Sequence, residues 1–170
     1  MNSQALRMFW DQIRQKYGVL LRVLEVIPEP QLHAHPIPGM RTPAELAAHV
    51  AGSIVRDIAV GVAKGAITAD ESREADIAAG LTSRASLLDH LRDCWARADA
   101  AVATITDSQL AASVPTPWGM SFPGAFAFHV LNDELLHHRG QLYAYARACG
   151  VEPPSLWSFA ENEPAFQHQT

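Results

Sequence analysis

The sequence has only two cysteines, Cys94 and Cys149, and no C-x-x-C pair. This excludes a disulfide-stapled fold and a zinc knuckle built from cysteines. Basic residues are also scarce, since 13 Lys and Arg stand against 18 Asp and Glu, which gives a formal net charge of −5. Without a basic run, neither nucleic acid nor an anionic membrane is expected as a partner.

Long apolar runs and targeting signals are missing as well. No uninterrupted apolar run approaches the roughly 20 residues that span a bilayer. The first residues lack the basic and apolar regions of a signal peptide. We therefore expect a cytoplasmic protein. At 170 residues, the chain is long enough for one domain with an ordinary core.

Four stretches of the chain repeat apolar residues at helical spacing, and none alternates as a strand would. Because each apolar stripe must bury against another element, this pattern predicts an all-α four-helix bundle. The long connections between the helices leave their order around the bundle open. The expected helices span residues 3–27, 42–64, 83–105 and 121–149.

Local signals predict where the helices begin and end. Ser3 is the expected cap of the first helix. Thr42 and Glu45 have the spacing of a capping box at the start of the second. Gly65 and Gly150 follow the second and fourth helices, where a left-handed cap is expected.

The segments between the helices carry weaker signals. Residues 66–81 are acidic and alanine-rich without a clear stripe, so we expect a surface connection with at most a short helical turn. Residues 107–120 are expected to form a loop. We divide the chain into a bundle, residues 1–150, and an irregular tail, residues 151–170, that packs on it.

The last expected helix places Glu134 and His138 one turn apart, within about 40° of each other on the helical wheel. Small and apolar residues continue their stripe, so the pair is expected to point into the core. An ionised carboxylate and an imidazole are costly there unless they pair or bind a metal. From spacing alone, a Glu–His hydrogen bond closing a helix turn is the commoner explanation, and a metal site is the alternative.

A catalytic zinc-type site needs about three protein ligands, and the remaining histidines do not identify the third one. His90 is expected on a solvated face, and His33 and His35 lie in a proline-rich loop. His49 falls off the centre of the apolar face of its helix. That position fits the mouth of a cavity and equally an ordinary surface histidine, so the pattern leaves the choice open.

Two motifs resemble a known family. The sequence His-Arg-Gly-Gln at 138–141 resembles the signature that closes the last bundle helix of the DinB/YfiT-like metalloenzymes. Residues 41–49 resemble that family's ligand segment on the second helix. The resemblance extends over roughly residues 3–150. It implies the family's bundle, and metal ligands at His49, Glu134 and His138.

Glu134 stands where most members of that family have histidine. The departure is similar to the related mycothiol-dependent maleylpyruvate isomerase branch. The resemblance implies one divalent metal ion, with zinc expected first and nickel, manganese or iron as alternatives. It also implies a low-molecular-weight thiol, because a metal held in this way can stabilise a thiolate or polarise a carbonyl group.

We therefore expect a metal-dependent transferase or isomerase that acts on small molecules. The alternative is a non-catalytic, stress-associated bundle that binds a metal or a ligand. Gln141 is expected to hydrogen-bond a ligand residue. Trp118 and Tyr145 can line the pocket, although core packing is the commoner explanation for both. Arg139 can stand near the site, but we favour a structural contact between helices for it.

The back of the last helix is apolar too. A helix that is apolar nearly all round is buried on more than one side. The commonest partner for such a face is a second copy of the chain, so we expect a homodimer. The residues concerned are Phe122, Phe126, Val130, Leu136 and Tyr143.

Overall fold

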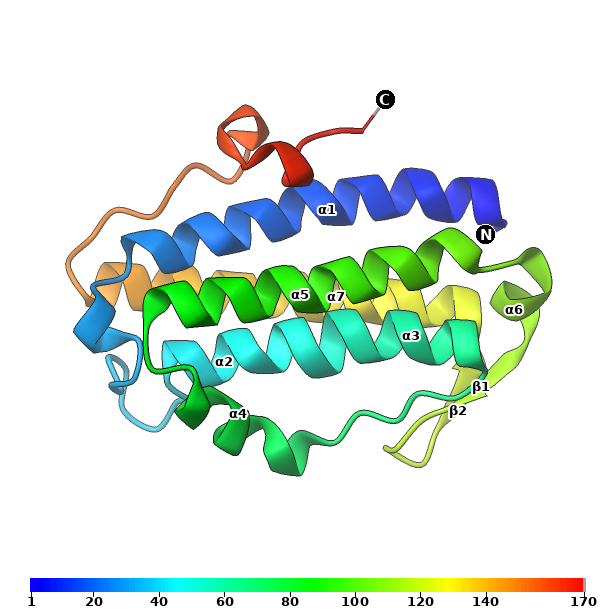
Figure 1. Cartoon of the computed structure of the whole chain (residues 1–170), viewed down its shortest axis with the longest axis horizontal. Helices are drawn as coiled ribbons and strands as arrows, with labels where there is room; N and C mark the ends of the chain where they lie inside the picture. Colours follow the sequence, from blue (N-terminus) through cyan, green and yellow to red (C-terminus); the bar gives the residue numbers. More distant parts are fainter. Residues whose placement is uncertain (170) are drawn as a thin grey trace.

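The computed structural model describes residues 1–169, apart from the side chain of residue 71, and confirms the all-α four-helix bundle (Figure 1). Three of the four long helical segments are each one continuous α-helix. The second is divided into three consecutive pieces. The four segments are α1 (Ser3–Val26), α2–η2–α3 (Pro43–His49, Val50–Arg56 and Asp57–Lys64), α5 (Arg84–Thr104) and α7 (Gly124–Ala148).

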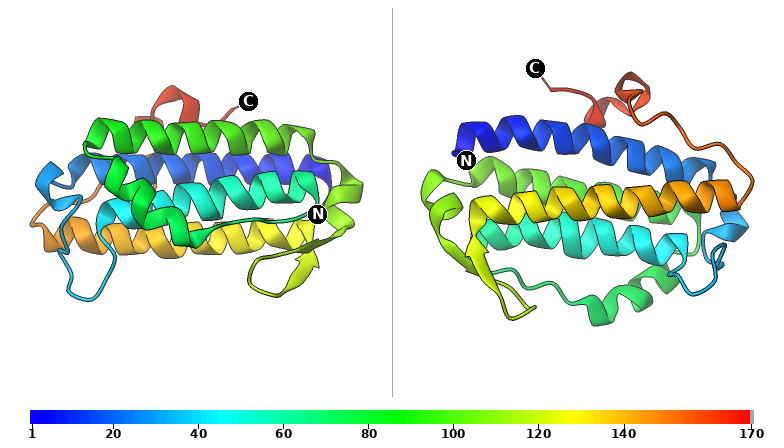
Figure 2. Two further views of the ribbon diagram at one scale, coloured as in Figure 1. Left: turned by 60° about the horizontal axis from the view of Figure 1, so that its bottom comes forward. Right: turned by 180° about the vertical axis from the view of Figure 1, so that it is seen from behind.

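The helix order follows from the packing. Both α1 and the α2–α3 segment pack against α5 and α7, so these two segments lie diagonally opposite each other (Figures 1 and 2). The α2–α3 segment ends at the end of the bundle opposite to the start of α5 (Figure 1). The connection between them therefore runs back along the bundle.

This crossover contains η3 (Glu71–Arg73) and α4 (Glu74–Gly80), and α4 packs on α2. The expectation of a plain surface connection is wrong for part of it, because Ile67, Glu74 and Ala78 are buried. The segment shows no clear apolar stripe, because only one side of the short α4 and a few isolated positions before it are buried by the bundle. The crossover brings α4 beside the part of α2 that carries His49.

The capping predictions hold at the second helix and at both glycines. The Thr42 hydroxyl accepts the Glu45 backbone N–H, and the Glu45 carboxylate accepts the Thr42 N–H. Gly65 and Gly150 have φ of 88° and 78°. The first cap is not Ser3 but the preceding residue, Asn2, whose side chain accepts the backbone N–H of Ala5.

A π-helical stretch, η2 (Val50–Arg56), begins directly after His49. A π-helix has a wider turn than an α-helix and shifts the helical register. A wheel drawn at 100° per residue therefore misplaces the residues before η2 relative to those after it. In the structure His49 and residues 50–55 are all buried.

The segment 107–120 is more ordered than the expected loop. It holds α6 (Asp107–Ala111) and β1 (Ser113–Pro115), which pairs antiparallel with β2 (Ser121–Pro123). The expectation that α7 begins at residue 121 is therefore wrong by three residues. Strands of three residues are too short to show an alternating pattern, which explains why they could not be predicted.

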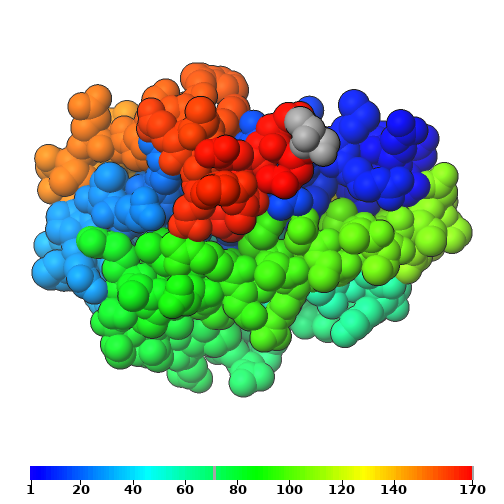
Figure 3. Space-filling model, turned by 45° about the horizontal axis from the view of Figure 1, so that its top comes forward, coloured from blue at the N-terminus to red at the C-terminus, as the bar shows by residue number. Residues whose placement is uncertain are grey.

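The C-terminal tail crosses the bundle over α1 and beside α5 (Figure 3). It contains η4 (Phe159–Glu161) and η5 (Pro164–Phe166). Phe166 is 2% exposed and contacts the rings of Tyr17 and Trp95, each at 5.7 Å between centroids. The tail fits closely over Gly18, where an added Cβ would lie 2.5 Å from Asn162 Nδ2.

Pro43–Lys64 is long and apolar enough to cross a membrane, with a mean hydropathy of 1.4 over its best 18-residue window. It is the one such helix in the part of the chain that the structure describes. Polar residues interrupt the run without lowering its mean hydropathy much, so a search for uninterrupted runs overlooks it. Within the bundle 78% of this window is buried, and the role of a core helix accounts for its composition.

Candidate functional site

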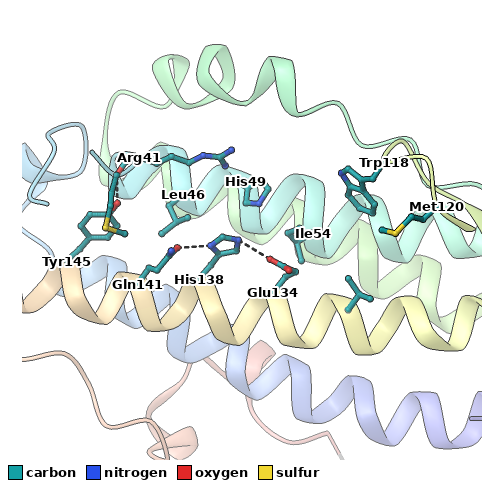
Figure 4. A pocket seen from close by; sticks show the side chains of 12 residues that line it. Arg41, Leu46, His49, Ile54, Trp118, Met120, Glu134, His138, Gln141 and Tyr145 are labelled. Atoms are coloured by element: carbon teal, nitrogen blue, oxygen red, sulfur yellow. Dashed lines mark hydrogen bonds and ion pairs between the residues drawn. The ribbon is translucent and has the colours of Figure 1, made fainter. Parts of the chain in front are cut away.

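A cavity of about 530 Å³ lies between the α2–η2 segment and α7 (Figure 4). Apolar side chains make up part of its wall: Met40, Leu46, Ile54, Met120 and Val130. Of the residues that the sequence singled out for the site, all but Arg139 line this cavity: His49, Trp118, Glu134, His138, Gln141 and Tyr145.

His49 is 6% exposed, and a buried carboxylate fixes its orientation. Its Nδ1 lies 2.7 Å from Glu74 Oε1, and Ser53 Oγ donates to the same oxygen. The other carboxylate oxygen of Glu74 accepts from Arg41 Nη1 at 3.0 Å. In the neutral ring, the proton on Nδ1 faces Glu74, and Nε2 of His49 carries the lone pair.

Glu74 is the residue that the sequence interpretation missed. It lies at the first position of α4, in the segment taken for a surface connection, and is 7% exposed. No local signal distinguishes it from the other acidic residues around it. Glu74 reaches the site because the crossover packs on α2, and the pattern of residues within the crossover alone does not show this contact.

On α7, Gln141 fixes the orientation of His138. Gln141 Oε1 lies 2.8 Å from His138 Nδ1. Its amide group is oriented in turn, because Nε2 faces His137 Nε2 at 3.2 Å. The other ring nitrogen of His138, Nε2, lies 3.3 Å from Glu134 Oε2 and pairs with that carboxylate. Burial is the main cause that lowers the pKa of His138, which favours the neutral ring.

The three side chains converge from two helices (Figure 4). The rings of His49 and His138 lie edge to face, with centroids 5.0 Å apart and an interplanar angle of 89°. The expectation that Glu134 and His138 point into the core is wrong for Glu134, whose side chain is 43% exposed, whereas the His138 side chain is 13% exposed and faces the cavity. Their stripe borders a cavity, and Glu134 stands at its opening. As arranged, no three His, Cys, Asp or Glu side chains among the described residues could hold a metal ion.

The N-terminal end of α2 closes one side of the cavity. The Tyr145 hydroxyl donates to the backbone oxygen of Arg41 and ties α7 to the residue just before this helix. Burial raises the pKa of the Tyr145 phenol, so the group stays protonated and remains a donor. The guanidinium of Arg41 is thereby held beside Glu74 and at the cavity rim.

The connection between the two short strands covers the opposite side of the cavity. Trp118 and Met120 come from this turn and are 38% and 58% exposed (Figure 4). Gly119 between them has φ of 77°, a value at which a residue without Cβ is favoured. A ligand in the cavity would therefore meet two large apolar side chains at this end.

Comparison with known proteins agrees with the architecture and the motifs. The family model described as the DinB superfamily matches residues 12–142. The chain belongs to the DinB superfamily. No protein of curated function matches the sequence.

Solved structures with this fold include two DinB-like proteins. The one from Bacillus cereus has a TM-score of 0.69 and 20% identity, and the match covers 86% of this chain and 94% of that one. The one from Bacillus subtilis has a TM-score of 0.65 and 18% identity, with 84% and 92% covered. At such identities the likeness establishes the shared fold.

A mycothiol-dependent maleylpyruvate isomerase also has this fold, with a TM-score of 0.59 and 15% identity. The match covers 98% of the DinB chain described here and 66% of the isomerase. The present chain thus spans about two thirds of the isomerase's length.

Arg139, together with the neighbouring Gly140, lies on another face of this DinB protein than His138 and Gln141. It lines a second cavity together with Gly140 and Tyr143, and not the cavity that holds His138. Burial lowers the pKa of its guanidinium. Arg139 therefore does not join the side chains around His49.

Proposed function

We propose that this DinB protein binds one divalent metal ion through His49, Glu134 and His138 and acts on a small molecule in the adjoining cavity. The orientation of the two imidazoles carries the proposal. Each has its Nδ1 engaged by another side chain, so that Nε2 is the ring nitrogen through which it would bind a metal ion. Histidines that bind metals are typically held in this way by a carboxylate or an amide behind the ring.

The donor set fits a cation chemically. His138 Nε2 and Glu134 Oε2 are already 3.3 Å apart, and a divalent ion could replace the proton that pairs them. Two imidazole nitrogens and one carboxylate are common ligands of zinc at catalytic sites. The half-exposed Glu134 side chain has freedom to turn towards both rings. We expect zinc first, and nickel, manganese or iron as alternatives.

The surrounding residues would prepare the site for chemistry. Glu74 and Gln141 hold the two imidazoles, and Tyr145 keeps Arg41 at the rim. The apolar wall limits the access of water and strengthens charge interactions inside the cavity. A bound divalent ion with an open position lowers the pKa of a water or thiol ligand and polarises a carbonyl group.

We infer a thiol-dependent transferase or isomerase as the reaction class. The shared fold with a mycothiol-dependent isomerase supports this inference. The cavity has both an apolar wall and a charged rim, as expected for a small polar thiol and an organic substrate. Binding of cysteine-derived thiols would raise the melting temperature of the metal-loaded protein. Metal binding without any thiol or substrate turnover would instead favour the non-catalytic alternative.

Elemental analysis of the purified protein tests the metal site. We expect close to one divalent ion per chain in the wild type, and loss of the metal in both His49→Ala and Glu134→Gln. His33→Ala is a matched control, because His33 is exposed and does not line the cavity. Equal metal content in all four proteins would refute the site.

We also propose a cytoplasmic homodimer that uses the outer face of α7. Phe126 is 53% exposed there and lies edge-on to Phe122, with ring centroids 5.5 Å apart. Phe122 is partly buried against the core, and the exposed ring of Phe126 beside it favours association with a second copy. Light scattering at low micromolar concentration is expected to give a dimer for the wild type and a monomer for Phe126→Glu.

A further inference from the structure

The guanidinium of Arg139 has no protein acceptor among the residues that the structure describes. Its Nη1 is buried without a hydrogen bond, and no ion pair involves any of its nitrogens. An unpaired charge in a partly buried place is costly. Lys16 adds to this cost, because the two positive charges repel each other across the α1–α7 contact.

A cavity of about 530 Å³ lies beside this guanidinium. Its walls come from one face of α7 and from the first residues of the tail, including Pro153 and Ser155. The Tyr143 hydroxyl donates to the Pro154 backbone oxygen at 2.7 Å and fixes the tail against the helix. The space is thus bordered by two elements that a hydrogen bond holds together, and it is open to solvent.

Further groups around the cavity are suited to a negative charge. Arg147 lies two turns after Arg139, and its one hydrogen bond is a long one of 3.4 Å to the Tyr143 backbone oxygen. Ser155 Oγ accepts the Trp157 N–H and keeps its own O–H to donate. At Gly140 an added Cβ would meet no atom within 4 Å, so the helix backbone lies open to the cavity.

From these observations we propose that this second cavity binds a small oxyanion, namely the phosphate or carboxylate group of a small molecule, with Arg139 as its principal partner. The planar guanidinium presents several N–H donors in a fork that matches both groups. The site is separate from the one around His138 and does not depend on the proposed metal.

One residue of the wall opposes an anion. Glu152 lines the cavity and forms no ion pair with Arg139 or Arg147. Its charge would repel a bound phosphate across the cavity. The proposal therefore makes two predictions of opposite sign, in which loss of the arginine weakens binding and loss of the glutamate strengthens it.

Calorimetric titration with sodium phosphate, at an ionic strength held constant with sodium chloride, tests the proposal. We expect saturable binding to the wild type, at least tenfold weaker binding to Arg139→Gln, and several-fold tighter binding to Glu152→Gln. A parallel titration with sodium acetate distinguishes a phosphate site from a general carboxylate site. Arg97→Gln is the matched control, since Arg97 is 64% exposed and paired with Asp93.

Two outcomes would overturn the proposal. One is no saturable binding of either anion at millimolar concentration, which would mean that water alone satisfies Arg139. The other is binding that responds equally to Arg139→Gln and Arg97→Gln, which would indicate unspecific attraction. Should Arg139→Gln fail to fold, Gly140→Ala replaces it, because its methyl group narrows the cavity without meeting protein atoms. This variant is expected to fold normally and to bind phosphate more weakly.

Discussion

At the scale of single residues, the carboxylate of Glu74 decides the state of His49. It accepts from the imidazole, from Ser53 and from Arg41 and is itself buried. A carboxylate with three donors stays in one position, and it keeps the ring in one tautomer and one orientation. His49 is therefore prepared to use Nε2 before any ligand arrives.

Replacing Glu74 by Gln is expected to weaken metal binding by about 10- to 100-fold, because the ring loses its fixed orientation and its charged acceptor. A competition titration against a chelator measures the affinity, and the visible spectrum of the cobalt(II) form reports the ligand geometry. Glu25→Gln is the control, since Glu25 is an exposed residue of α1. Unchanged affinity and spectrum in Glu74→Gln would contradict the role assigned to this residue.

His90 gives a second prediction at this scale. The sequence placed it on a solvated face, but it is half-buried and its Nε2 lies 3.6 Å from Cys94 Sγ. Burial, followed by the nearby Arg56, lowers the pKa of His90. The folded protein thus resists a proton that the unfolded chain takes up near its usual pKa of about 6.5. Stability is fully retained above that pH and falls as the pH drops through it.

Urea unfolding at pH 7, 6 and 5 checks this sign. His90→Gln is expected to lose less stability than the wild type between pH 7 and 5, because it no longer carries the group that favours the unfolded state in acid. His129→Gln, a change at an exposed histidine, is expected to follow the wild type. The same dependence on pH in all three proteins would speak against the effect.

The residue scale also shows what the sequence could reveal about the site. Glu134 and His138 were visible as a pair because their spacing within one helix is local. The wheel could not place His49, because the π-helical stretch beside it changes the register. Glu74 had no signal of its own, since a crossover of the chain brings it to the site.

At the scale of elements, local chemistry sets the boundaries that the sequence predicted well. The capping box at Thr42 and the left-handed Gly65 involve atoms within a few residues of one another. The three-residue strands and the late start of α7 depend instead on contacts over longer distances. Gly124, for example, lies so close to α6 that an added Cβ would be 2.5 Å from the Gln109 backbone oxygen.

Two helical glycines form a matched pair for an experiment. Gly18→Ala is expected to destabilise the protein by about 1–3 kcal/mol, because its Cβ would overlap Asn162 and Phe166 of the tail. Gly140→Ala is expected to stabilise it by about 0.5–1 kcal/mol, since alanine favours the helix and meets no neighbour. Urea denaturation measures both. Equal changes in unfolding free energy for the two variants would mean that the tail does not pack closely against α1 at Gly18.

At the scale of the whole molecule, the tail is part of the packed structure. The Arg22 guanidinium donates to the backbone and hydroxyl oxygens of Ser158, and Asn162 donates to the backbone oxygen of Gln15. Together with the buried ring of Phe166, these contacts fasten the tail along α1. The sequence indicated an irregular segment with aromatic residues but not which of them would be buried.

Phe166→Ala is expected to cost about 3–5 kcal/mol of unfolding free energy, because it removes a buried ring from between Tyr17 and Trp95. Tryptophan fluorescence during urea unfolding follows the change, since Trp95 and Trp10 both lie in the core. Met8→Ala is the control, with an expected loss below about 0.5 kcal/mol for a side chain of α1 that is 67% exposed. Similar losses in both variants would contradict the packing of the tail.

The course of the crossover has a consequence for how firmly the protein can retain an ion. The acid that steadies His49 belongs to the short α4, which is attached to the bundle by far fewer buried residues than a long helix. If α4 moved away from α2, Glu74 would no longer hold the His49 imidazole, and a metal ion at the proposed site would be bound more weakly. Substitutions at exposed positions of α4 are therefore expected to change the residence time of a metal ion at the proposed site, without altering the four long helices.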